Sequence, residues 1–194
     1  MSPRANLTKQ TVIQTAADLI NAEGLEALSL GHLAKELDIR TPSLYNHVDG
    51  LPGLMQELSI LNAHNLADRL SEAAIGQSGA DAVRAIMGAM RGYIKGCPGL
   101  YLSTVGASGT QAEVDPELEQ EEARSVKVGM TVMASFGLKG EEAVHALRGM
   151  RSLVHGFATL EISGGFGIPL DLEESFSRLV DLFIAGLEQQ RFNG

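Results

Sequence analysis

Apolar residues recur at helical spacing along most of this 194-residue chain, and they seldom alternate with polar residues as a half-buried strand requires. The first two apolar stripes consist of Val12, Ala16, Leu19 and Ile20, and then of Leu30, Leu33, Ala34 and Leu37. Gly and Pro residues separate the later stripes and mark where one helix ends and the next begins. The pattern predicts an all-α fold of about nine helices.

The residues at the expected helix starts include good N-caps. Ser29 can cap the second helix, and Thr41-Pro42 supplies an N-cap followed by a proline at the first helical position. Asp171 and Glu174 have the spacing of a capping box before the last helix. The nine helices are expected at about 9–23, 30–37, 42–48, 52–74, 81–95, 100–105, 116–136, 141–162 and 172–190.

The break at Asp49-Gly50 divides three short helices from a much larger helical segment. We therefore expect a small domain at residues 1–50 and a larger one at residues 51–194. Three helices in about 40 residues bury too little surface to be very stable alone. The small domain is expected to pack on the N-terminal end of the fourth helix.

The segment from Ser29 to His47 has the pattern of a helix, a short turn and a second helix. The turn needs a residue near the left-handed conformation, which Asp38 tolerates better than most residues. In the second helix Leu44 and Val48 face inward, and the outward residues form hydrogen bonds but carry no fixed charge: Thr41, Ser43, Tyr45, Asn46 and His47. Such side chains suit the base edges and phosphates of a major groove. The alternative is an ordinary helical hairpin with a polar outer face.

This segment resembles the N-terminal domain of the tetracycline-repressor (TetR) family of bacterial transcription regulators. The resemblance covers nearly all of residues 8–60 and rests on LAKELDI at 33–39 and TPSLYNHV at 41–48, which keep the family's Leu-Tyr-x-His core. RSLVHGFATLE at 151–161 is similar to a Trp-His-Gly motif of one branch, with Val154 where Trp would stand. The chain differs from the family pattern in having Asp38 for the usual turn Gly, and no Lys at the start of the fourth helix.

The resemblance implies that double-stranded operator DNA is a partner, contacted by Arg4, Lys9, Ser29, Arg40, Thr41, Pro42, Ser43, Tyr45, Asn46 and His47. Tyr45 and His47 are expected to reach phosphates, and Arg40 is placed for a phosphate or a base. Arg4 and Lys9 lie on an arm that could add backbone or minor-groove contacts. The helix-turn-helix would therefore be the DNA-binding domain.

The chain carries 24 acidic and 15 basic residues, a net charge of −9, which taken alone would argue against a nucleic-acid partner. The charge is unevenly placed. Residues 1–50 hold four basic and six acidic residues, whereas the remainder holds 11 basic and 18 acidic ones. With about three or four phosphates neutralised per subunit, we expect weak binding to non-specific DNA and a moderate salt dependence.

The last two helices have apolar stripes wider than a single core contact requires. The resemblance implies that these helices pair with their two-fold mates in a four-helix bundle, which would make the protein a homodimer. The residues expected at this interface are Leu147, Val154, Gly156, Phe176, Val180 and Phe183. The alternative is a pair of helices buried on both sides within one chain.

Met and aromatic residues gather on the middle helices, where the resemblance implies a site for a partly apolar small-molecule effector. The expected ligand-binding residues are Met87, Met90, Tyr93, Tyr101, Met130, Met133, Met150 and Phe157. Met suits an adaptable cavity because its side chain is unbranched and polarizable, although such a stripe is more often plain core. His64, His145 and His155 could anchor a polar group or could be ordinary surface and core histidines. Their spacing fits no metal site, so neither a metal nor a cofactor is expected.

These features favour a homodimeric, ligand-responsive transcription regulator, most simply a repressor that a small molecule releases from its operator. The alternative is a DNA-binding regulator or activator without an inducer. An enzyme is disfavoured because no acidic residue orients His155 beside Ser152. The single cysteine, the absence of a signal peptide and the lack of a membrane-spanning run favour a cytoplasmic location.

Overall fold

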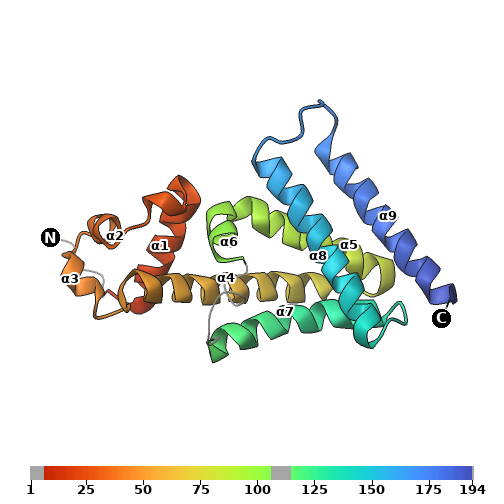
Figure 1. Cartoon of the computed structure of the whole chain (residues 1–194), viewed down its shortest axis with the longest axis horizontal. Helices are drawn as coiled ribbons and strands as arrows, with labels where there is room; N and C mark the ends of the chain where they lie inside the picture. Colours follow the sequence, from red (N-terminus) through yellow and green to blue (C-terminus); the bar gives the residue numbers. More distant parts are fainter. Residues whose placement is uncertain (1–6, 106–114, 194) are drawn as a thin grey trace. The chain divides into compact units, whose positions relative to one another are not determined.

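The computed structural model describes residues 7–105 and 115–193, and regular structure in these ranges is entirely helical (Figure 1). The helices are α1 (Lys9–Glu23), the single 3₁₀ turn η1 (Leu25–Ala27), α2 (Leu30–Glu36), α3 (Thr41–Leu44), α4 (Gly50–Ala74), α5 (Gly79–Gly96), α6 (Pro98–Thr104), α7 (Pro116–Ala134), α8 (Gly140–Ile162) and α9 (Leu172–Asn193). The described residues contain no strand, and the predicted all-α fold is confirmed.

The chain divides into two compact units. The N-terminal unit comprises residues 1–63 and 97–119, and the C-terminal unit comprises residues 64–96 and 120–194. Helices α4 and α7 each contribute residues to both units. A functional boundary at residue 50 remains a prediction, because compactness does not say where DNA binding ends.

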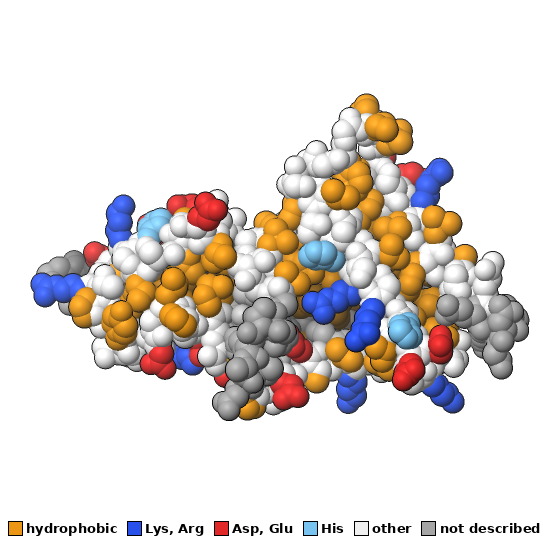
Figure 2. All heavy atoms as spheres, in the orientation of Figure 1, with side chains coloured by type: hydrophobic (Ala, Val, Ile, Leu, Met, Phe, Trp, Pro, Cys, Tyr) orange, Lys and Arg blue, Asp and Glu red, His pale blue; other side chains and the backbone are white. Residues whose placement is uncertain are grey.

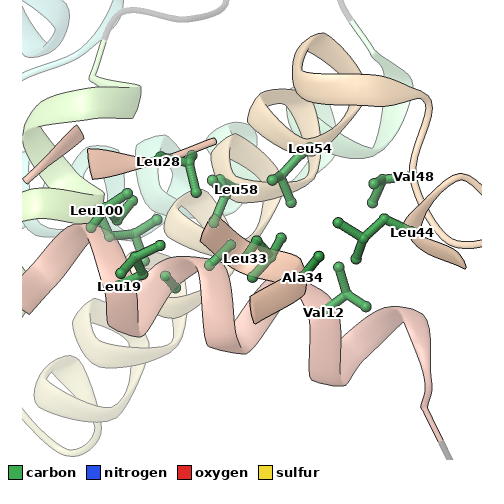
Figure 3. Close-up of a cluster of buried hydrophobic side chains, with 13 residues drawn as sticks. Val12, Leu19, Leu28, Leu33, Ala34, Leu44, Val48, Leu54, Leu58 and Leu100 are labelled. Carbon is green, nitrogen blue, oxygen red and sulfur yellow. The ribbon is translucent and has the colours of Figure 1, made fainter. Parts of the chain in front are cut away.

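Buried aliphatic side chains from five helices form the core of the N-terminal unit (Figure 3). Val12 of α1, Leu33 of α2 and Leu44 of α3 are fully buried, as are Leu54 and Leu58 of α4. The α4 residues belong to its N-terminal half, as expected for a small helical unit that cannot bury enough surface by itself. This core fixes the first three helices against α4.

Helix α6 approaches the backbone of α1 so closely that only glycine fits. The Leu100 amide donates a hydrogen bond to Oδ1 of Asn21 at 2.9 Å. A Cβ atom on Gly99 would lie 2.0 Å from the carbonyl oxygen of Ile20, which backbone geometry holds in place. Leu100 is buried in the same core. The missing side chain at Gly99 therefore permits the α1–α6 contact.

Helix α5 packs against α8 and α9 in the C-terminal unit. Met87 of α5, Met133 of α7 and Val154 of α8 are all fully buried. Gly129 of α7 leaves room for the Leu147 side chain of α8, because a Cβ atom there would lie 2.3 Å from a Leu147 methyl group. Apolar packing therefore holds these helices together.

Helices α4, α5 and α6 each begin two residues earlier than expected, and two of the predicted helix caps are wrong. Arg40, not Thr41, is the N-cap of α3, because the Arg40 carbonyl accepts a hydrogen bond from the Ser43 amide at 2.8 Å and Thr41 is already helical. Asp171 caps α9 as expected, but Glu174 does not complete a capping box. Its Oε1 accepts a hydrogen bond from Nε of Arg178, one turn further along.

Gly99→Ala is expected to lower the free energy of unfolding by about 1–3 kcal/mol, because the new methyl group forces α6 away from α1. Gly96→Ala is the matched control, since a Cβ there meets no atom within 4 Å. Replacing a helical glycine in open space should leave stability unchanged or raise it by up to about 1 kcal/mol. Urea unfolding at one protein concentration measures both, and equal effects of the two substitutions would contradict the packing argument.

Candidate functional site

The turn between α2 and α3 has the geometry that the sequence predicts. The Ser29 hydroxyl accepts a hydrogen bond from the His32 amide at 3.1 Å and so caps α2. Asp38 has φ of 52° and is the one non-glycine residue with positive φ in the described ranges. The Ile39 amide then donates to the Ala34 carbonyl at 2.9 Å. The turn is thus closed by backbone hydrogen bonds on both sides of Asp38.

The α3 segment buries two apolar side chains and exposes its polar ones. Leu44 is fully buried and Val48 is 5% exposed, as predicted for the inward pair. A backbone hydrogen bond from the Val48 amide to the Leu44 carbonyl extends the segment past the end of the helix. Tyr45 is 61% exposed. Arg40, Pro42 and Asn46 are also exposed, and Thr41, Ser43 and His47 are partly exposed.

The exposed surface around α3 therefore offers hydroxyl, amide and imidazole groups with one adjacent guanidinium. Fixed acids lie close in sequence, because Asp38 and Asp49 flank the segment and both are exposed. Recognition by this surface would depend on hydrogen bonds more than on net positive charge. Such an arrangement can contact base edges and a few phosphates.

The predicted basic arm differs from the structure where it can be compared. Lys9 is the first residue of α1 rather than part of an arm, and its Nζ lies 2.7 Å from Oε1 of Glu57. Its charge is therefore partly compensated within the chain. Arg4 lies outside the described residues.

A second candidate site is a groove of about 510 Å³ between α5 and α9 in the C-terminal unit. It is lined by Arg84, Gly88, Arg91, Gly92, Lys95, Glu173, Phe176, Ser177 and Val180. Of these, only Phe176 and Val180 carry a predicted role, and that role is dimerisation. None of the eight expected ligand-binding residues lines this groove.

Arg91 lines the groove and is only 5% exposed. Its Nε and Nη2 donate to the two carboxylate oxygens of Glu161 on α8, both at 2.8 Å. Its Nη1 and Nη2 donate to Glu173 on α9 at 2.7 and 2.8 Å. Lys95 adds a contact to Glu161 at 2.6 Å. This Arg91 cluster consists of two cations and two carboxylates.

The hydrogen bonds of the cluster shift the pKa of Arg91, Glu161 and Glu173 in the direction that favours their charged forms. Hydrogen bonds to Glu161, and then to Glu173, raise the pKa of Arg91. The guanidinium hydrogen bonds lower the pKa of Glu161 and of Glu173. Two aromatic rings also contact Arg91, since its guanidinium carbon lies 4.6 Å from the ring centroid of Phe176 and 5.3 Å from that of Phe157.

Sequence periodicity missed the Arg91 cluster, although one signal was present. Arg91 stands four residues after Met87 on the apolar face of α5, where a fixed charge requires a buried partner. The partners of Arg91 could not be identified from the sequence, because Glu161 and Glu173 lie 70 and 82 residues further along the chain.

The predicted ligand-binding residues are mostly core. Met87, Met90, Tyr93, Met133 and Met150 are buried in the C-terminal unit, and Tyr101 is buried in the N-terminal unit. Met130 and Phe157 are partly exposed. Among the possible polar anchors, His64 is exposed and lies 3.3 Å from Asp68 and 3.5 Å from Glu121. His145 is exposed and His155 is partly buried.

The predicted dimer residues fall into two groups. Val154, Phe176 and Val180 are buried within their own chain, whereas Leu147, Gly156 and Phe183 are partly exposed. Two further apolar residues on these helices are exposed and were not among the predicted interface residues: Leu160 at 48%, which belongs to the wide apolar stripe of α8, and Leu182 at 73%. Figure 2 shows apolar side chains gathered along α8 and α9 on one face of this unit.

Within residues 7–105 and 115–193, no group of three or more His, Cys, Asp or Glu side chains is placed to hold a metal ion. None of the helices in these same residues has the length and apolar character needed to cross a lipid bilayer.

Comparison with known proteins identifies relatives over nearly the whole chain. A family model described as "Tetracyclin repressor-like, C-terminal domain" matches residues 83–183. The HTH-type transcriptional regulator YobS of Bacillus subtilis is 31% identical over 188 residues, which are 96% of each chain. These similarities are to transcription regulators and not to enzymes.

Solved structures share the fold. A protein from Rhodococcus sp. RHA1 superimposes with a TM-score of 0.81 at 19% identity, covering 97% of this chain and all of that one. ActR of Streptomyces coelicolor, in complex with actinorhodin, gives a TM-score of 0.70 at 21% identity, covering 96% and 99% of the two chains. At these identities the structural matches establish the architecture alone.

Glu161→Gln is expected to lower the free energy of unfolding at neutral pH by about 1–3 kcal/mol, because it removes a buried charged acceptor from Arg91. The ordinary pKa of glutamate is 4.5, and that of Glu161 is lower in the folded state. The free energy of unfolding of the wild type therefore exceeds that of Glu161→Gln by its full amount above pH 4.5. This difference is lost as the pH falls through the pKa of Glu161 in the folded state.

Urea unfolding of wild type and variant between about pH 7 and pH 3 measures this difference. Asp181→Asn is the control, since Asp181 pairs with Arg84 where both side chains are about half exposed. A wild-type advantage that stays constant down to the lowest pH would contradict the assigned role of Glu161.

Proposed function

We propose that this chain, which belongs to the TetR family of transcriptional regulators, binds operator DNA as a homodimer and represses transcription until a small molecule releases it. The observation that carries the DNA-binding part is the exposed polar surface of α3, fixed on a buried core by Leu44 and Val48. This proposal places the protein in the cytoplasm, together with the DNA.

In this proposal α3 enters the major groove and the N-terminus of α2 meets the backbone. Asn46 can pair with adenine through its amide, and Thr41 and Ser43 can reach base edges or phosphates. Tyr45, which is 61% exposed, supplies a phosphate contact through its hydroxyl. Arg40 adds the one fixed positive charge at the start of α3.

The dimer is proposed to form through α8 and α9. Two recognition helices must meet half-sites about 34–36 Å apart, or a multiple of that spacing, so a two-fold axis is required for tight binding. Exposed Leu160 and Leu182 give these helices apolar surface that a partner could cover. Partly exposed Leu147, Gly156 and Phe183 would join them, whereas buried Val154, Phe176 and Val180 would support the interface from behind.

The ligand response is proposed to act through α4, whose residues belong to both compact units. An effector bound in the C-terminal unit would shift α4, move the recognition helices apart and lower operator affinity. The actinorhodin complex of ActR, which shares this fold, supports the idea that the architecture accommodates a small molecule.

A second candidate is a regulator that needs no inducer. Its support is the burial of most expected ligand-binding residues, since Met87 and Met133 have no exposed surface and so line no open cavity in this conformation. DNA binding measured with and without candidate effectors distinguishes the two proposals.

Tyr45→Ala is expected to weaken binding to a specific duplex about 10- to 100-fold while changing the free energy of unfolding by less than about 0.5 kcal/mol. The side chain is exposed, so its loss leaves the core intact. Fluorescence anisotropy with a labelled duplex measures affinity. Leu25→Ala, an exposed apolar substitution on η1, is the control and should bind as wild type. Unchanged affinity of the Tyr45 variant would refute the placement of α3.

Arg40→Gln is expected to reduce the slope of log affinity against log salt concentration by about one per subunit, because one phosphate contact is lost. The comparison is Arg178→Gln, which removes an exposed charge that pairs with Glu174 in the C-terminal unit. Anisotropy titrations across a range of salt concentrations give both slopes. Identical slopes for the two variants would show that Arg40 meets no phosphate.

A further inference from the structure

One face of α5 forms a wall of the groove, and at two successive helical turns this wall has a glycine and therefore no side chain. Arg84, Gly88, Arg91, Gly92 and Lys95 recur at helical spacing and all line the groove. A Cβ atom on Gly88 or Gly92 would meet no other atom within 4 Å. The two glycines therefore leave flat, open backbone surface between cationic side chains.

The opposite wall comes from α9 and is apolar in its middle. Phe176 is 6% exposed and Val180 is 4% exposed. Ser177, next to Phe176 in sequence, adds a hydroxyl group to this wall. The Phe176 ring lies against the Arg91 guanidinium. The groove thus has an apolar floor that ends at a buried positive charge.

The two carboxylates on Arg91 are held very differently. The Glu161 side chain is only 10% exposed and lies 2.6 Å from Nζ of Lys95, whereas Glu173 lies 3.9 Å from it. The Glu173 side chain is 75% exposed, where water competes for its hydrogen bonds. Glu173 uses Nη1 and Nη2 of Arg91, the two-pronged edge that fits any carboxylate.

We infer that this groove binds a flat aromatic carboxylate, whose carboxylate replaces that of Glu173 on Arg91. Substitution of one carboxylate by another keeps the buried guanidinium paired, so the exchange does not strand a charge. The apolar body of the ligand would lie over Phe176 and Val180, against the bare backbone of Gly88 and Gly92. A groove of about 510 Å³ is in the usual range for small-molecule sites.

The second arginine that lines the groove, Arg84, limits the ligand to one acidic group, because it is already paired with Asp181 at 2.7 Å. Of the two arginines, only Arg91 has an exposed carboxylate partner that accepts two hydrogen bonds from it. The identification of this compound class as the effector rests on the proposed function, whereas the binding site itself does not.

Isothermal titration of the full-length protein with 2-naphthoate tests the site, with neutral 2-naphthamide as the matched compound. Glu173→Gln removes the competing carboxylate and is expected to raise the affinity for 2-naphthoate about fivefold or more. Glu174→Gln is the matched control, because this neighbouring carboxylate pairs with Arg178 and not with Arg91, and its loss should leave affinity within about twofold. 2-Naphthamide should bind more weakly than 2-naphthoate to every variant.

Gly92→Leu provides an independent test that retains the fold, since its side chain enters open space on a helix. It should abolish 2-naphthoate binding with helical circular dichroism unchanged. Equal affinity of wild type and Glu173→Gln, equal affinity for the amide, or undiminished binding to Gly92→Leu would each overturn the site. Binding to duplex DNA is measured separately by anisotropy without ligand. Failure of the ligand-free wild type to bind any duplex would refute the proposed function, whereas failure of 2-naphthoate to bind the protein would refute only the groove.

Discussion

The burial of Leu44 is the interaction on which the proposed DNA-binding surface depends. Helix α3 has four residues, and a single helical turn is unfavourable by itself because it orders several backbone dihedrals for one hydrogen bond. Leu44 compensates by packing among residues of α1, α2 and α4 (Figure 3). With Leu44 and Val48 held inside, the remaining side chains of the segment have only the outer surface to occupy. Their orientation is a consequence of the core.

The C-terminal unit is held by apolar packing and by a buried charge that needs partners. Removing a guanidinium from water is costly unless carboxylates meet it with good hydrogen-bond geometry. Arg91 obtains them from α8 and α9, so three helices converge on one side chain. The need of buried Arg91 for carboxylate partners also underlies the inferred binding site, because the exposed carboxylate of Glu173 can be exchanged for the carboxylate of a ligand.

Local features were predictable from sequence because their causes are local. The Ser29 cap, the left-handed Asp38 and the inward Leu44–Val48 pair each follow from residue type and spacing within one turn of helix. The N-cap of α3 was misplaced by one residue, since a Thr-Pro pair fits two adjacent registers and the backbone of Arg40 decided between them.

The remaining features depend on contacts that periodicity does not encode. A wide apolar stripe shows that a helix is covered on more than one side, but not whether its own chain or a partner covers each position. For example, both Val154 and Leu160 belong to the apolar stripe of α8, but Val154 is buried within its own chain whereas Leu160 is exposed. The partners of Arg91 were hidden for the same reason, because they come from helices distant in sequence.

Selection of binding sequences from a pool of random DNA duplexes tests the central claim most directly. The purified protein is incubated with the pool, and bound duplexes are amplified and sequenced over several rounds. The account predicts enrichment of an inverted repeat whose half-site centres are about 34–36 Å apart or a multiple of that distance. Failure to enrich any sequence, or enrichment of sites without two-fold symmetry, would contradict a homodimer that reads DNA through α3.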